Sequence, residues 1–243
     1  MVIGNTSQIR EPRFWSSWKG SIIRAIVLDG LYQKQEILKR TQLEKEQFEQ
    51  ALNELFQNGF LNGTQNDRFW VNSHELYNEY REFYKELQEK LVGWVNDWRQ
   101  KKLGALWKQT KPSHFFLEDK LLYDFSEKLI GHSSLEILVA NPFVQRCHLS
   151  NSLMEISKKG INVKLITRSF SKPYINEFSD SRVSTTYDES VHAKIILVDR
   201  CVGIVSSMNL FANSSGGGSW EAGLVTTGRN AVQSISRSVL NKI

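Results

Sequence analysis

Cysteine is scarce in this chain, with Cys147 and Cys201 the only two in 243 residues. Two cysteines cannot build the disulfide framework of a small secreted protein or a zinc site made of several thiolates. No apolar run approaches the roughly 20 residues that a membrane-spanning helix needs. The first residues, MVIGNTSQIREPRFW, lack the basic and apolar regions of a signal peptide. We therefore expect a cytoplasmic protein without a membrane partner.

What the sequence does contain is typical of a globular protein. Hydrophobic residues make up 40% of the chain, which is enough for a packed core, and the length allows two small domains. The net charge is +5 and the pI is about 9.1. This mild basic excess permits an anionic partner without identifying one.

The N-terminal third has the pattern of three helices followed by a hairpin. A helix is expected over 13–30, opening after a proline and ending at a glycine, and a second one over 33–40. Helical spacing of apolar residues predicts a third helix over 43–59, and two short strands around a polar turn are expected within 60–72. This order predicts a mainly α, winged helix-turn-helix-like domain over 1–73.

The expected third helix is a poor DNA reader because its polar face is acidic. That face carries Glu44, Glu46, Glu49 and Glu54 against a single Lys45, and acidic side chains repel phosphates. We favour a domain used for contact with a protein partner or for dimerisation, and DNA binding stays open.

A long linker helix is expected next, within a segment of residues 74–112. Tyr80, Tyr84, Leu87, Leu91, Trp94 and Trp98 follow one another by four and three residues, close to a heptad. This seam packs either on its own chain or on a second copy, and periodicity does not separate the two. The break in GALWKQTKPSH, near 104–113, predicts that a new domain begins at residue 113.

Residues 113–243 alternate between strand and helix patterns. We expect helices over 117–131, over 149–160 and from Asn230 onward. Strands are expected in LEILVANPF, INVKLITR, HAKIILVD, VGIVSS and GLVTT. Short apolar strands between helices predict an α/β domain with a mixed sheet flanked by helices.

Polar and ionisable side chains lie at the ends of two neighbouring expected strands. In a strand, side chains two apart share a face, so His192 and Lys194 should project together. If the next strand pairs alongside, Ser207 and Asn209 should share that face. An ammonium, a hydroxyl and an amide suit a phosphate, and an imidazole can attack phosphorus.

This stretch, VHAKIILVDRCVGIVSSMN (191–209), resembles the signature of the phospholipase D superfamily, HxKxxxxDxxxxxxGSxN. Ser206 stands where the family usually has glycine, which removes no functional group. Glu221, in SWEAG, lies where the family commonly has an acidic residue. The resemblance covers roughly residues 114–243, and it implies a phospholipase D-like domain there.

The resemblance also implies a mechanism, in which a histidine forms a covalent phosphohistidine and two motif copies act together without a metal or cofactor. This chain has one copy, so we expect a homodimer. His192 would be the nucleophile, and Lys194, Ser207 and Asn209 would bind the phosphate. Glu221 would fix the imidazole tautomer, and Asp199 would have a structural role.

We therefore predict a metal-independent phosphodiesterase, most simply a nuclease acting on DNA or RNA. The main alternative is a winged-helix transcriptional regulator whose phospholipase D-like domain binds a ligand, similar to archaeal sensors of that arrangement. A third is a nuclease subunit recruited through its N-terminal domain by a protein partner.

Overall fold

The computed structural model of the chain describes residues 9–64, 67–72, 74–104, 113–215 and 218–243. The chain divides into two compact units, Met1–Glu86 (unit 1) and Leu87–Ile243 (unit 2). This division falls inside a long helix. The division into 1–73, 74–112 and 113–243 expected from the sequence stays a prediction.

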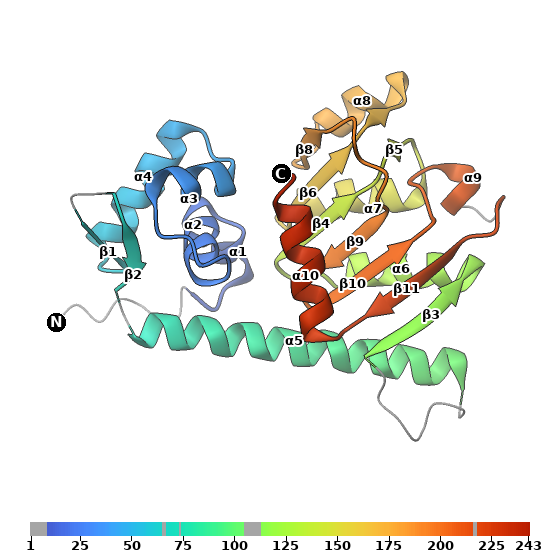
Figure 1. Cartoon of the computed structure of the whole chain (residues 1–243), viewed down its shortest axis with the longest axis horizontal. Coiled ribbons are helices and arrows are strands. Elements are labelled where there is room, and N and C mark those ends of the chain that lie inside the picture. The colour runs from blue at the N-terminus through green and yellow to red at the C-terminus, as the bar shows by residue number, and fades with distance from the viewer. Residues whose placement is uncertain (1–8, 65–66, 73, 105–112, 216–217) are drawn as a thin grey trace. The chain divides into compact units, whose positions relative to one another are not determined.

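Unit 1 is a group of helices followed by a two-stranded sheet (Figure 1). Its elements are α1 (Pro12–Trp15), α2 (Trp18–Val27), α3 (Lys34–Thr41), α4 (Lys45–Gln57), β1 (Leu61–Gly63) and β2 (Phe69–Val71). The strands pair antiparallel, with Leu61 opposite Val71, so the predicted hairpin is confirmed. Whether this helical unit is a winged helix stays a prediction.

The single helix expected over 13–30 is wrong, because the structure has two helices there. Ser17 has extended backbone angles between them, and its side chain accepts a hydrogen bond from the N–H of Gly20 at 3.2 Å. A serine in this position caps a new helix, and its hydroxyl also bonds the Phe14 carbonyl of the preceding one. The cap at Ser17 therefore divides the segment into two helices, although the spacing of its apolar residues had predicted one continuous helix.

The long helix α5 (His74–Leu103) buries its aromatic seam against its own chain. In unit 1, the rings of Tyr80 and Trp15 lie 4.5 Å apart between centroids. In unit 2, the rings of Trp94 and Trp98 lie 5.5 and 4.8 Å from that of Phe125. The seam therefore packs on the same chain, and contact of this helix with a second copy stays a prediction. The predicted break at 105–112, including Pro112, lies outside the described residues.

Unit 2 is built on a seven-stranded mixed sheet with the strand order β3-β11-β10-β9-β4-β6-β8. The strands are β3 (His114–Glu118), β4 (Glu136–Ala140), β6 (Asn162–Thr167), β8 (Ser184–Tyr187), β9 (Ile195–Val198), β10 (Val202–Ser206) and β11 (Ala222–Thr226). β4, β6 and β8 pair in parallel, and the remaining pairs are antiparallel. β5 (Phe143–Val144) and β7 (Ser169–Phe170) form a separate two-stranded parallel sheet. The predicted mixed sheet flanked by helices is therefore confirmed.

The helices of unit 2 are α6 (Asp119–Gly131), α7 (His148–Lys158), α8 (Lys172–Ser179), α9 (Ala212–Ser215) and α10 (Arg229–Leu240). The helix expected over 117–131 begins only at Asp119, because the preceding residues form β3, where buried Phe115 and Leu117 alternate with exposed residues. None of the described helices is both long enough and apolar enough to cross a membrane.

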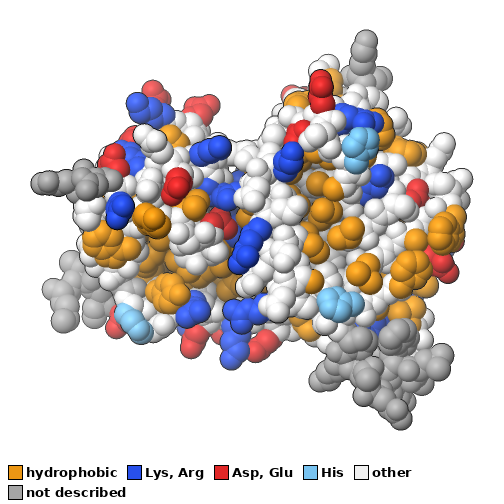
Figure 2. Space-filling view, in the orientation of Figure 1, with side chains coloured by type: hydrophobic (Ala, Val, Ile, Leu, Met, Phe, Trp, Pro, Cys, Tyr) orange, Lys and Arg blue, Asp and Glu red, His pale blue; other side chains and the backbone are white. Residues whose placement is uncertain are grey.

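One face of the sheet is only partly covered by α10, which packs on β4, β9 and β10 (Figure 1). Gly203 lies under Ile235 of this helix, so Val205, two residues further along β10, points to the same face. Val205 pairs with Leu224, and Leu224 with Phe116, and all three side chains are exposed. We call these three residues the apolar row, and Figure 2 shows exposed hydrophobic side chains on this side of unit 2.

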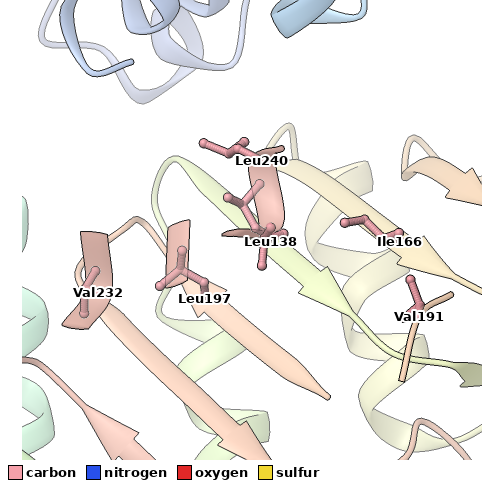
Figure 3. Packing of buried hydrophobic residues seen from close by; sticks show 7 residues of the cluster. Leu138, Ile166, Val191, Leu197, Val232 and Leu240 are labelled. Carbon is pink, nitrogen blue, oxygen red and sulfur yellow. The ribbon is translucent and has the colours of Figure 1, made fainter. Parts of the chain in front are cut away.

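Beneath α10 the same face is an apolar core (Figure 3). Leu138 and Leu197 lie opposite each other on β4 and β9, and both are fully buried. Val232 and Leu240 reach them from α10, and Val191 joins the cluster from the segment just before β9. Burial of Val191 fixes the backbone next to His192, so the packing of α10 helps to position the candidate site.

Candidate functional site

Apart from Asp199, the residues singled out by the sequence motif gather at one end of the sheet. Ile195 at the start of β9 pairs with Val205 near the end of β10, and the N–H of Ser206 bonds the Lys194 carbonyl at 3.0 Å. The segment before β9 therefore lies beside the segment after β10. Gly223 pairs with Ser206, which brings the start of β11 to the same place.

The sequence placed His192 and Lys194 on the strand itself, which is wrong, because β9 begins only at Ile195 and both residues lie in the segment before it. The side chain of His192 is exposed. The ammonium of Lys194 donates a hydrogen bond to the backbone carbonyl of His192 at 3.3 Å, which keeps its charge close to the backbone of that residue. Outside the regular ladder, both side chains are free of the strict alternation that a strand imposes.

A second cation contacts His192 that the motif does not include. Nη1 of Arg168 lies 3.3 Å from Nε2 of His192. A guanidinium has only donors, so this geometry requires Nε2 to accept and places the proton of a neutral imidazole on Nδ1. Arg168 directly follows β6, a parallel strand, and ligands of α/β sheets bind at the carboxyl ends of such strands. That position was the signal in the sequence that could have identified Arg168.

Glu221 is buried, and its carboxylate accepts hydrogen bonds from the hydroxyls of three serines. Its Oε2 accepts from Ser207, and its Oε1 accepts from Ser214 and, at 2.9 Å, from Ser219. In the described part of the chain, its carboxylate has no hydrogen bond to His192. The predicted role of Glu221 in orienting that imidazole stays a prediction. Ser214 and Ser219, which hold this carboxylate, lie on either side of residues 216–217, which are outside the described residues.

Asn209 follows the serines on a segment that is tied to β4. Its backbone N–H donates to Ser214 Oγ at 2.8 Å, while its own Oδ1 is buried without a partner among the described residues. Asn141, at the end of β4, donates to the Met208 carbonyl at 3.1 Å and accepts from the N–H of Leu210 at 3.2 Å. Asn141 thus holds the turn that carries Asn209, a role that sequence reasoning missed.

Asp199 lies at the opposite end of β9 from His192. It is fully buried, with a left-handed φ of 49°, and its carboxylate accepts the N–H groups of Ser134, Leu135 and Glu136, each at 2.8 Å. Burial raises the pKa of Asp199 to about 6, and the three N–H donors act in the opposite direction. Asp199 joins the turn after β9 to the start of β4, and it does not approach the phosphate-binding residues proposed above.

The arrangement has a clear chemical character. Two cations, an imidazole, hydroxyls and an amide lie where several strands of a mixed sheet end, which is a setting for binding an anionic group such as phosphate. Among the described residues, no group of three or more histidine, cysteine, aspartate or glutamate side chains could hold a metal ion.

The comparison with known proteins agrees with the phospholipase D-like domain expected from the sequence. Residues 127–242 match the family model described as "Cardiolipin synthase, PLD-like domain". The chain therefore contains a phospholipase D-like domain over these residues. No curated protein sequence matches the chain.

Three solved structures that are similar to this chain have low TM-scores. The phospholipase D family member Nuc from Salmonella typhimurium has a TM-score of 0.48 at 15% identity, covering 54% of this chain and 93% of its own. NucT from Helicobacter pylori has a TM-score of 0.44 at 12% identity, covering 53% and 96%. The archaeal chromatin protein TrmBL2 has a TM-score of 0.38 at 11% identity, covering 97% of both chains. The family assignment rests on the sequence match.

Proposed function

We propose that this protein is a metal-independent phosphodiesterase, a nuclease that cleaves DNA or RNA through a covalent phosphohistidine at His192. The observation that carries the proposal is the meeting of the segments before β9, after β10 and before β11 at one end of the sheet. These segments bear His192, Lys194, Ser207, Asn209 and Glu221. The family match over residues 127–242 supports phosphodiester chemistry.

The proposed reaction has two displacement steps. Nε2 of His192 attacks phosphorus, a P–N bond forms, and the bond to the leaving oxygen breaks as that oxygen takes a proton. Water then attacks phosphorus, gives up a proton, and breaks the P–N bond. Lys194, Ser207 and Asn209 would hold the non-bridging oxygens, where the charge of Lys194 counts most.

The proton donor would be His192 of a second copy, in a homodimer. One chain supplies one motif histidine, whereas the reaction uses a nucleophile and a separate acid. The apolar row supports a second copy, because Phe116, Leu224 and Val205 are exposed on strands that end at the site. Val205 is two residues from Ser207, so a copy seated on the row would also approach the site.

A ligand-binding regulator is the second candidate, and one observation favours it. The Nε2 lone pair of His192 accepts from Arg168, and both oxygens of Glu221 are engaged by serines. Such a site can hold a phosphate without attacking it. Unit 1 would then transmit the binding to DNA or to a protein.

Unit 1 would bind a protein partner in either case. It has a hollow of about 570 Å³ lined by Ile26, Val27, Gly30, Trp70, Val71, Asn72, His74 and Tyr77. The ring of Trp70 is 45% exposed there, and an exposed tryptophan beside a hollow is typical of protein interfaces. Glu49 and Glu54 of α4 form ion pairs with Lys34 and Lys19 of this chain, which reduces their repulsion of a phosphate, so DNA binding by unit 1 also stays open.

Incubation of the purified protein with labelled single- and double-stranded DNA and RNA in EDTA tests the proposal. Wild-type protein should cleave at least one of the four, and His192→Ala protein none. Binding of the same substrates without cleavage by the wild type would favour the regulator.

A further inference from the structure

The lone pair of His192 Nε2, which the proposed reaction uses, is occupied in this structure. Its partner is Nη1 of Arg168 at 3.3 Å, and Arg168 is half-buried at the end of β6. A guanidinium bonds a phosphate oxygen more strongly than a neutral imidazole, because both partners are then charged. A phosphodiester entering the site would draw Arg168 onto itself and release Nε2.

Arg168 is also stacked on an aromatic ring. Its guanidinium carbon lies 4.5 Å from the ring centroid of Phe143, at the start of β5. The Phe143 side chain is 38% exposed, whereas Val144, the next residue of the same strand, is fully buried. The strand therefore turns Phe143 outward beside a cation that contacts His192.

A second exposed ring lies at the same end of the sheet. Tyr187 ends β8 and pairs with Thr167, the residue before Arg168, and its side chain is 56% exposed. Its ring lies 6.0 Å from that of Phe170, which holds it from one side. Two exposed rings thus accompany the cation on this side of His192.

We propose that Arg168 and Phe143 form a nucleotide subsite that selects single-stranded nucleic acid, with Tyr187 as a further stacking ring. This inference rests on the proposed function. Arg168 takes the phosphate and Phe143 stacks on an unpaired base, which a duplex offers only after the base leaves the helix.

A phospholipid would be held by the same charge, but the surroundings of Phe143 do not suit acyl chains. Gln145 and Arg146, the next exposed residues along the chain, are polar. Binding to a lipid surface scales with buried apolar area, and a ring among polar neighbours offers little. The same ring is sufficient for one base, because every base has a π face.

Binding measured without cleavage tests the subsite. Full-length His192→Asn protein is titrated, by fluorescence anisotropy in EDTA, into labelled single strands of about 12 nucleotides and into the matching duplex. Phe143→Ala should weaken single-strand binding roughly 5- to 100-fold, Phe143→Trp should restore it, and duplex binding should change less than about twofold. Arg168→Ala should weaken both and reduce the slope of log K against log salt by about one unit.

Arg182→Ala is the charge-matched control. Arg182 is exposed and precedes β8, at the opposite end of that strand from Tyr187, so its loss should leave the affinity for single strands unchanged. Circular dichroism of each variant confirms that it is folded. If the Phe143→Ala variant binds single strands as tightly as the protein that keeps Phe143, the proposed subsite is wrong. So would binding to phosphatidylglycerol vesicles that depends on Phe143 while oligonucleotide binding does not.

Failure of the subsite and failure of the proposed function give different results. If wild-type protein cleaves nothing, but single-strand binding depends on Phe143 and Arg168, hydrolysis is wrong and the subsite stands. If wild-type protein cleaves strands and duplexes with the same KM, and Phe143→Ala changes neither, the nuclease stands and the subsite is wrong.

Discussion

Ser207 donates its only hydroxyl proton to Oε2 of Glu221, and this hydrogen bond joins the end of β10 to the start of β11. The same hydroxyl oxygen accepts the N–H of Ala222 at 3.1 Å. In this state Ser207 cannot also donate to a phosphate, so substrate binding must redirect its proton. The carboxylate of Glu221 is therefore an organising centre of the loop that follows β10.

Removal of that centre should destabilise unit 2. Glu221→Ala leaves three serine hydroxyls without their acceptor, and we expect the free energy of unfolding to fall by roughly 1–3 kcal/mol in urea denaturation. Glu221→Gln keeps an acceptor for Ser214 and Ser219 and should lose less. A Glu221→Ala protein as stable as the wild type would show that the serines do not need the carboxylate.

Asp199 should be important for stability. Asp199→Ala leaves three N–H groups, two of them buried, without an acceptor, and we expect a loss of roughly 3–5 kcal/mol of unfolding free energy. Asp199→Asn keeps Oδ1, which accepts two of them, and should lose about 1–3 kcal/mol. Thermal or urea unfolding measures both, and an unfolding free energy for Asp199→Ala within about 1 kcal/mol of the wild type contradicts this role.

The sequence predicted the mixed sheet because apolar strands such as LEILVANPF alternate with helical segments. It did not predict β3, since HFFLE runs directly into α6 and reads as the start of that helix. The motif brought His192 to the same sheet end as Ser207 through the register of β9 and β10. The motif does not include Arg168, which follows β6, a strand separated from β9 by β4, and only its position after a predicted parallel strand indicated it.

Cleavage should persist in EDTA. Lys194 and Arg168 already supply positive charge next to His192, the charge that a metal would otherwise bring to a phosphate. Rates measured in excess EDTA and in Mg²⁺ should agree within about twofold. A strict requirement for Mg²⁺ or Zn²⁺ would contradict the proposed chemistry.

Activity should depend on two copies of the chain. If equal amounts of His192→Ala and wild-type protein exchange subunits, activity should fall to about half that of the wild-type protein alone, because mixed dimers keep one histidine. Without exchange it should not fall. Full activity from a monomer, as measured by light scattering, would rule out the second histidine as the acid.

The apolar row should hold the two copies together. Leu224→Lys places a charge in the middle of the row and should yield a monomer with little activity. Tyr32→Lys is the matched control, because Tyr32 has a similar exposure of 49% against 47% but lies in unit 1. Light scattering of the two variants should differ, and a dimeric Leu224→Lys protein would exclude this surface.

The most direct measurement is detection of a nucleotide attached to His192. Wild-type protein is mixed with an excess of single-stranded oligonucleotide in EDTA, stopped in alkali, which preserves a P–N bond, and analysed by peptide mass spectrometry. We predict an adduct on the peptide that contains His192, absent from His192→Asn protein. Full-rate cleavage by His192→Asn protein, or an adduct on a different residue, would contradict the account.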